Sequence, residues 1–206
     1  EAPLSHQICN GLANALVDAD PLAVEACMAR IDAAANYYGR VGVGAHAMAG
    51  INQALWDIAG KAHDVPIYQL FGGPFKKSFR AYCSILFGDT PEATYDLARR
   101  HADMGFTAIK FGWGPMGQSE ENDIALVREA RRGAGQDVDI LVDAGQVWDW
   151  KTALQRAESF AEYGIFWLEE PLHPQDVAGY AQLCTASPVP IATGEAESNL
   201  TDFERL

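Results

Sequence analysis

Three acidic side chains recur at equal spacing in the second half of the chain. Asp143, Glu169 and Glu195 each lie at the end of a short apolar run, and successive acids are 26 residues apart. We interpret this interval as one strand–helix repeat, so that the acids end three neighbouring parallel strands, about 4.8 Å apart and at the same height. Carboxylates packed so closely need a cation among them to stay ionised. The pattern therefore predicts a metal site.

The chemistry of the expected site follows from its ligands and from Lys110, which ends the preceding apolar run. Oxygen ligands with room left for water and substrate favour a hard ion, Mg²⁺ before Mn²⁺ or Ca²⁺. A cation beside Lys110 would lower the pKa of its ammonium, which suits a catalytic role in proton transfer. Glu170 should point away from Glu169, because side chains alternate along a strand, and should serve as a supporting or ion-pair residue.

The acids also have an ordinary explanation. A single acid at a strand end is usually a helix N-cap or a solvated loop charge. Three acids at one register, with a lysine on the strand before them, are much harder to explain in that way. We therefore favour the metal site over the ordinary explanation.

The chain beyond residue 75 alternates short apolar runs with amphipathic ones. We expect strands at 79–87, 107–111, 138–142, 165–168 and 189–193, and helices at 91–104 (N-capped near Thr90), 120–132, 150–163 and 175–185. Strands that alternate with helices predict a parallel sheet with helical crossovers, and repeats of roughly 25 to 32 residues are typical of a (β/α) barrel. A closed TIM barrel needs about eight strands and ~250 residues, so we expect a partial barrel of about five strands in residues 76–206.

The first 75 residues have a helical pattern. A helix is expected from Leu22 to Tyr38, because Asp20-Pro21 is a helix-start signal, and a second from Ala45 to His63. The apolar face of the second helix should comprise Ile51, Leu55, Ile58, Ala59 and Ala62. The Pro- and Gly-rich stretch at 66–74 is typical of a turn and marks the expected domain boundary, which separates a helical part at 1–75 from the partial barrel.

Composition and charge exclude several classes of protein. The chain has 206 residues, 49% hydrophobic and 21% charged, and a net charge of −13. This charge repels nucleic-acid phosphates and anionic membranes, so we expect neither as a partner. The chain has no apolar run of ~18 residues, and the residues at its start lead us to expect no signal peptide. Four scattered cysteines are expected to be reduced and mostly buried, so we expect a cytoplasmic protein.

Several motifs together resemble a known family. Asp143, the Leu-Glu-Glu-Pro at 168–171 and the Gly-Glu at 194–195 resemble the three metal-ligand motifs of the enolase superfamily, mandelate racemase subgroup. Residues 49–61, with Pro66, Leu70 and the glycines at 72–73, are similar to the family's junction between capping domain and barrel. The resemblance implies an α+β capping domain, of which 1–75 is the helical part, before a modified TIM barrel. It also implies removal, assisted by Mg²⁺, of a proton α to a carboxylate through an enediolate.

The sequence departs from the family pattern at two places. Many members carry K-x-K on the second barrel strand, whereas this chain has Lys110-Phe111-Gly112. This leaves open whether Lys110 is the base or binds the substrate carboxylate. The position two after Asp143, often Asn in the subgroup, is Gly145. The family's other base, a His paired with an Asp, would lie beyond Leu206.

These departures favour one reaction over others. Racemisation needs a proton donor on each face of the substrate, whereas dehydration can use a single base. We therefore favour dehydration of a small-molecule sugar acid (an aldonate or aldarate) to a 2-keto-3-deoxy acid. The alternatives are a racemase or epimerase of an α-substituted carboxylic acid, and a truncated non-catalytic fragment or interaction protein on the same scaffold. Unpaired edges of an open sheet also lead us to expect a homo-oligomer.

Some further residues lie near the expected site. Trp113, Trp148 and Trp150 follow the second and third barrel strands, and they either floor a substrate pocket or pack against helices. His173 is expected to be a loop residue without function, with substrate contact as the alternative. The Gly-rich stretch 111–117 is expected to form a mobile loop near the site, because it lacks the spacing of a nucleotide-binding motif.

Overall fold

The computed structural model describes residues 2–206, which form two compact units. One unit comprises the described residues up to Phe79 together with Ser198–Glu204. The other comprises Arg80–Glu197 with the last two residues. The predicted division at residue 75, into the helical part of a capping domain and a partial barrel, stays a prediction.

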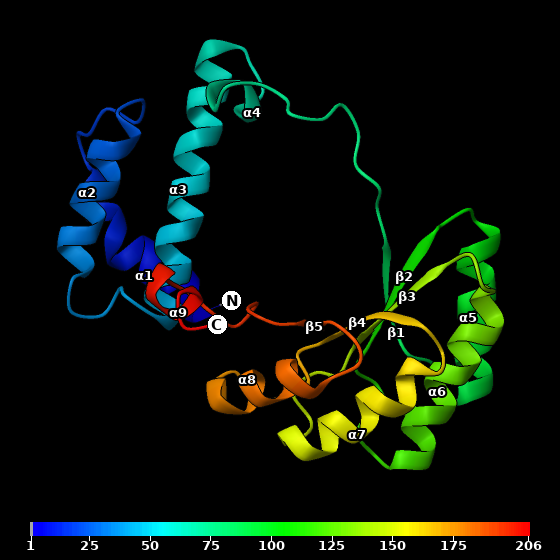
Figure 1. The fold of residues 1–206 in the computed structure, drawn as a ribbon. Coiled ribbons are helices and arrows are strands. Elements are labelled where there is room, and N and C mark those ends of the chain that lie inside the picture. Colours follow the sequence, from blue (N-terminus) through cyan, green and yellow to red (C-terminus); the bar gives the residue numbers. More distant parts are fainter. Residues whose placement is uncertain (1) are drawn as a thin grey trace. The chain divides into compact units, whose positions relative to one another are not determined.

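The first unit is helical, as expected. Its elements are α1 (Ala2–Asn10), the 3₁₀ helix η1 (Leu12–Leu16), α2 (Val24–Ala35), α3 (Gly42–His63), α4 (Ile67–Leu70) and α9 (Leu200–Phe203) (Figure 1). Helix α2 is shorter than predicted at both ends. Asp20 accepts a hydrogen bond from the backbone N–H of Leu22 (2.9 Å) and so closes a turn before the helix. Helix α4 lies within the stretch that was predicted to be only a turn.

Helix α3 buries a narrower face than the sequence predicted. Ile51, Leu55 and Ala59 are buried in the core that α3 shares with α2 and η1. Ile58 and Ala62 are exposed, so their predicted place on this face is wrong. The reason is that the buried positions follow one another at intervals of four, which turns the two other side chains toward solvent.

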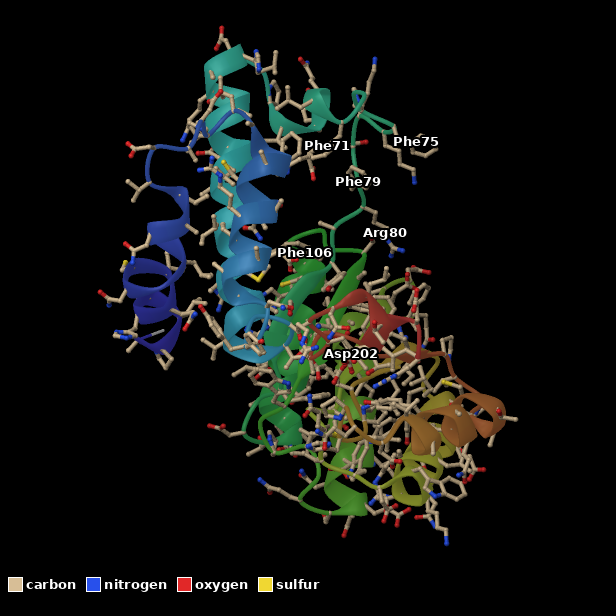
Figure 2. All side chains as sticks on the ribbon, turned by 90° about the vertical axis from the view of Figure 1, so that its left-hand side faces the viewer. Phe71, Phe75, Phe79, Arg80, Phe106 and Asp202 are labelled. Carbon is tan, nitrogen blue, oxygen red and sulfur yellow. The ribbon has the colours of Figure 1, made fainter. Side chains whose placement is uncertain are left out.

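The chain between α4 and the first strand has no regular structure. It carries Phe71, Phe75 and Phe79, whose side chains stand on an extended segment in Figure 2. The side chains of Phe75 and Phe79 are almost fully exposed. The strand expected from residue 79 therefore begins later than predicted.

The second unit holds a parallel sheet of five strands in the order β1-β2-β3-β4-β5. The strands are β1 (Cys83–Leu86), β2 (Ala108–Gly112), β3 (Asp139–Asp143), β4 (Ile165–Glu169) and β5 (Ile191–Ala192). Helices α5 (Pro91–Asp103), α6 (Glu120–Ala134), α7 (Trp150–Ala161) and α8 (Val177–Ala186) connect them in turn (Figure 1). This architecture confirms the predicted fold class, five strands of the (β/α) type after a helical part.

Each of the four connecting helices has a side chain that caps its first turn. Thr90, Ser119, Asp149 and Asp176 precede α5, α6, α7 and α8, and each accepts a hydrogen bond from a backbone N–H of the helix, at 2.8–3.2 Å. A cap fixes the residue at which a helix begins. The loops that follow β1 to β4 therefore end at defined positions.

The two faces of the sheet differ sharply in composition. One face is apolar, since Ile109, Phe111, Ile140, Val142 and Leu168 pack into the core against the helices. By strand alternation, the residues between them, including Lys110, Asp143 and Glu169, lie on the other face. The sheet thus places its charged residues together, away from the helices.

The cysteines differ from expectation in burial. Cys27 is buried and Cys83 half-buried, but Cys9 and Cys184 are exposed, so the prediction of mostly buried thiols is wrong. All four are free thiols.

None of the helices in residues 2–206 combines the length and the apolar character needed to cross a bilayer.

One buried cation joins α6 to the starts of two strands. The guanidinium of Arg131 donates hydrogen bonds to the carbonyls of Tyr163 (2.8 Å), Gly135 (2.8 Å), Val138 (2.6 Å) and Gly164 (3.0 Å). Burial lowers the pKa of this group. Four carbonyls therefore depend on one side chain for their hydrogen bonds.

We predict that Arg131→Ala lowers the free energy of unfolding by about 3 kcal/mol, because it leaves several carbonyls without a donor. Arg128→Ala is the matched control on the same helix. Arg128 is half exposed and, among residues 2–206, forms its ion pair with Glu129, so its loss should cost less than about 1 kcal/mol. Urea unfolding of both variants measures the difference, and equal losses would contradict this account of Arg131.

Candidate active site

Two of the three predicted acids lie side by side. Asp143 and Glu169 are paired residues at the ends of β3 and β4, at the same height as the spacing predicted. Glu195 is not at this height, because Glu169 pairs with Ala192 and Glu195 lies three residues farther along the chain. The prediction of one register for all three acids is therefore wrong. Strand β5 ends at Ala192, so Glu195 lies in the loop beyond it.

Lys110 lies deeper in the sheet than the sequence suggested. Strand β2 continues to Gly112, which pairs with Asp143, while Lys110 pairs with Leu141. Lys110 therefore does not end its strand as predicted. Its long side chain nevertheless reaches the acids. The Nζ atom donates a hydrogen bond to Oε1 of Glu169 (2.5 Å) and lies 3.6 Å from Oδ2 of Asp143.

The ammonium of Lys110 and the two carboxylates are largely buried, with side-chain exposures of 12%, 8% and 14% for Lys110, Asp143 and Glu169. Burial by itself would lower the pKa of Lys110. The hydrogen bond to Glu169 and the negative charges of Glu169 and Asp143 outweigh burial and raise the pKa above its ordinary value. The lowering expected beside a bound cation stays a prediction, since the charges that face Lys110 in this structure are negative.

The acids disfavour one another's negative charge. Burial, followed by the charge of Glu169, raises the pKa of Asp143, although the N–H of Gly145 (3.1 Å) and Lys110 act in the opposite direction. Burial also raises the pKa of Glu195, with further contributions from Asp143, Glu170 and Glu169. Glu195 thus lies close enough to the pair to respond to its charge. The site has more negative charge than Lys110 neutralises.

Two aromatic residues that the sequence analysis missed complete the surroundings of Glu169. The indole Nε1 of Trp167 donates a hydrogen bond to Oε2 of Glu169 (2.8 Å), so both oxygens of this carboxylate have a donor. Trp167 contacts Tyr82 edge-on, and Nζ of Lys110 lies 5.8 Å from the centre of the Tyr82 ring. The position of Trp167, two before Glu169, was the available signal, since residues i and i+2 share a face of a strand.

Glu170 supports the site through hydrogen bonds rather than the ion pair considered from the sequence. Its side chain is buried and accepts bonds from Oγ1 of Thr193 (2.8 Å), N–H of Gly194 (2.8 Å) and Nε2 of Gln146 (3.0 Å). These partners follow β5 and β3. Glu170 therefore joins the loops after β3, β4 and β5, including the loop that carries Glu195.

A cavity of about 260 Å³ opens beside these charges. Its lining includes Lys110, Asp143, Glu195 and Trp113, together with Ser84, Ile85, Leu86 and Gly112.

Trp148 and Trp150 pack against the buried residues of α7 and α8, so of the three tryptophans considered only Trp113 lines this cavity. His173 is an exposed loop residue.

The residues fit Mg²⁺ in type and partly in position. Within residues 2–206, no three His, Cys, Asp or Glu side chains are gathered closely enough to hold an ion as they stand. Asp143 and Glu169 nevertheless face one and the same positive charge, the ammonium of Lys110. Glu195 lines the cavity next to Asp143, and carboxylate oxygens are the ligands that Mg²⁺ prefers. The ligand set Asp143, Glu169 and Glu195 stays a prediction.

We predict that Glu170→Ala lowers the free energy of unfolding by roughly 2–3 kcal/mol and speeds amide exchange at Gly194, because three donors lose their acceptor. Glu170→Gln is the matched control. Its remaining carbonyl oxygen can serve Thr193 and Gly194, while the amide of Gln146 can turn to accept. Hydrogen exchange and urea unfolding separate the two variants. Unchanged exchange at Gly194 in Glu170→Ala would show that Glu170 does not hold this loop.

Comparison with known proteins identifies related families along most of the chain. The family model of the mandelate racemase / muconate lactonizing enzyme N-terminal domain matches residues 2–72. The model described as enolase C-terminal domain-like matches residues 93–206. The two matches cover the helical part and most of the sheet unit.

Curated relatives include enzymes of sugar-acid metabolism. The D-galactarolactone cycloisomerase of Agrobacterium fabrum is 33% identical over 187 residues, which cover 87% of this chain and 48% of that protein. The L-talarate/galactarate dehydratase of Salmonella typhimurium is 30% identical over 197 residues, covering 95% of this chain and 49% of that protein. The chain thus spans about half the length of these relatives.

Solved structures share the same arrangement. A racemase from Streptomyces coelicolor A3(2), crystallised with bound magnesium, is 29% identical and superposes with a TM-score of 0.91. The match covers 99% of this chain and 60% of that one. The fold described above is therefore found in a protein that binds magnesium.

Proposed function

Because the chain belongs to the mandelate racemase / muconate lactonizing enzyme family of the enolase superfamily, we propose that it takes part in removing a proton α to the carboxylate of a sugar acid. The reaction we favour is dehydration to a 2-keto-3-deoxy acid. The observation that carries the proposal is the ammonium of Lys110, which Asp143 and Glu169 share at a cavity that Glu195 also lines.

In this proposal, Mg²⁺ is held by Asp143, Glu169 and Glu195. When bound, Mg²⁺ supplies Lewis-acid stabilisation of the negative charge that develops on the substrate carboxylate as the proton leaves. Asp143 and Glu169 are fixed in place by their strands, and Glu195 approaches on the loop held by Glu170. The indole N–H of Trp167 donates a hydrogen bond to Oε2 of Glu169, and this bond restricts the orientation of the carboxylate.

Lys110 acts as the fixed positive charge beside these acids. Its Nζ atom holds Oε1 of Glu169 and faces Asp143, and it also lines the cavity that would receive the substrate. An ammonium in this position can bind a substrate carboxylate and so orient the α-carbon. We propose that Lys110 contacts the carboxylate of the substrate in the reaction.

Gly112 supports dehydration over racemisation. It takes the place of the second lysine in the K-x-K pattern that the sequence resembles, and it faces Asp143 without a side chain. Inversion at a carbon requires a proton donor on each face, and at this position the chain provides none. The magnesium-bound racemase neighbour keeps racemisation as the second candidate reaction.

We expect the full-length protein, supplied with Mg²⁺ and a panel of aldonic and aldaric acids, to release a 2-keto-3-deoxy acid from at least one of them. Keto-acid formation is measured as the semicarbazone, with the intact mass recorded on the same sample. Deuterium exchange with inversion at C2, and no keto acid, would instead identify a racemase. Neither product from any acid would contradict the proposed function.

We predict that Asp143→Asn, Glu169→Gln and Glu195→Gln each weaken Mg²⁺ binding at least about 10-fold, because each removes one charged oxygen ligand. Isothermal titration calorimetry with MgCl₂ measures the change without any need for substrate. Glu162→Gln, an exposed acid just after α7, is the control for net charge. A variant that keeps wild-type affinity would be removed from the ligand set.

A further inference from the structure

Trp113 has an unusual conformation for a large side chain. It follows β2 directly, and its backbone φ of 51° lies in the left-handed region that residues with a Cβ rarely adopt. Its side chain is 54% exposed although it lines the cavity beside Lys110 and Asp143. A strained backbone that holds an exposed indole at a cavity is a pattern found at functional sites.

The indole of Trp113 lies over Gly145. A Cβ atom at Gly145 would be 2.7 Å from Cδ1 of Trp113, and Gly145 itself has a φ of 66°. No larger residue fits at this position unless the indole moves. The backbone N–H of Gly145 also donates to Oδ1 of Asp143 (3.1 Å). The glycine at 145 therefore makes room for Trp113 next to the Asp143 carboxylate.

The loop that carries Trp113 is held by several hydrogen bonds, and its expected mobility stays a prediction. The N–H of Trp113 donates to the carbonyl of Asp143 (3.1 Å), and the N–H of Met116 donates to the carbonyl of Trp113 (3.2 Å). The N–H of Gly117 donates to Oδ1 of the buried Asp123 (2.7 Å). These bonds hold the backbone of Trp113 in one place.

The cavity therefore has two kinds of lining. Lys110 and Asp143 provide charges, whereas Trp113 and the exposed Leu86 of β1 provide apolar surface. A hydroxy acid has the same division, since it carries a carboxylate at one end and C–H groups along its carbon chain. The flat face of an indole packs against C–H groups by dispersion and excludes water from them.

We propose that Trp113 is a specificity-determining residue, whose indole, placed by Gly145, packs on the carbon chain of a five- or six-carbon hydroxy acid. This inference rests on the proposed function, because it places the carboxylate of the ligand at Lys110. A longer carbon chain offers more C–H groups to the indole, so Trp113 should favour six-carbon over three-carbon hydroxy acids.

The test compares D-galactonate, with six carbons, and D-glycerate, with three, as probes that carry one carboxylate each, in the presence of Mg²⁺. Dissociation constants come from calorimetry and from quenching of tryptophan fluorescence. We expect Trp113→Ala to weaken D-galactonate binding about 10-fold and D-glycerate binding less than about 2-fold. Trp113→Phe should keep most of the affinity for D-galactonate. Trp56→Phe, in the helical unit, is the control.

Gly145→Ala gives a second, independent variant. Its added methyl group would collide with Cδ1 of Trp113, so it should displace the indole and reproduce the selective loss seen in Trp113→Ala. Thermal unfolding checks that this variant folds, and Trp113→Ala decides the question by itself if it does not. Where turnover is found, the loss should fall mainly on KM.

The two proposals fail in different ways. If the wild-type protein binds D-galactonate and Trp113→Ala binds it equally well, the role of Trp113 is wrong while the proposed function stands. Equal weakening for D-galactonate and D-glycerate would also overturn the chain-length role. If the wild-type protein binds and converts none of the sugar acids, the proposed function fails and this inference fails with it.

Discussion

Buried carboxylates on neighbouring strands of one sheet face need a positive charge between them. Asp143 and Glu169 are in this position because β3 and β4 end in register, and Lys110 supplies the charge from β2. The single charge of Lys110 does not balance the negative charge of the acids, since the pKa values of Asp143 and Glu195 are raised. The remaining negative charge is what makes this face of the sheet a place for a divalent cation.

The rest of the unit holds these charges where they are. Helices pack on the opposite, apolar face of the sheet, so the charged residues gather on the site face. Capping side chains fix where each helix begins, and Glu170 and Asp123 hold the loops by accepting backbone N–H groups. The carboxylates of Asp143 and Glu169 accept hydrogen bonds from the N–H of Gly145 and from Lys110 and Trp167, which lower the cost of burying like charges.

Much of this arrangement could be predicted from the sequence, and the failures have physical reasons. Equal spacing correctly placed Asp143 beside Glu169, because β3, α7 and β4 form one regular repeat. The same spacing misplaced Glu195, because spacing cannot show that β5 ends after two residues. Lys110 lies deeper in the sheet than predicted, because β2 continues to Gly112 and the sequence pattern did not show this strand end. The contact of Trp113 with Gly145 joins two loops, and no local pattern reports such a contact.

The most direct measurement is a crystal structure of the protein grown with Mn²⁺, which replaces Mg²⁺ and can be located by its anomalous scattering. The account predicts a single strong peak bonded to carboxylate oxygens of Asp143, Glu169 and Glu195 at about 2.1–2.2 Å, with the Lys110 ammonium displaced from Glu169. A peak elsewhere, or no peak with Lys110 still bonded to Glu169, would contradict the claim that these acids form a cation site.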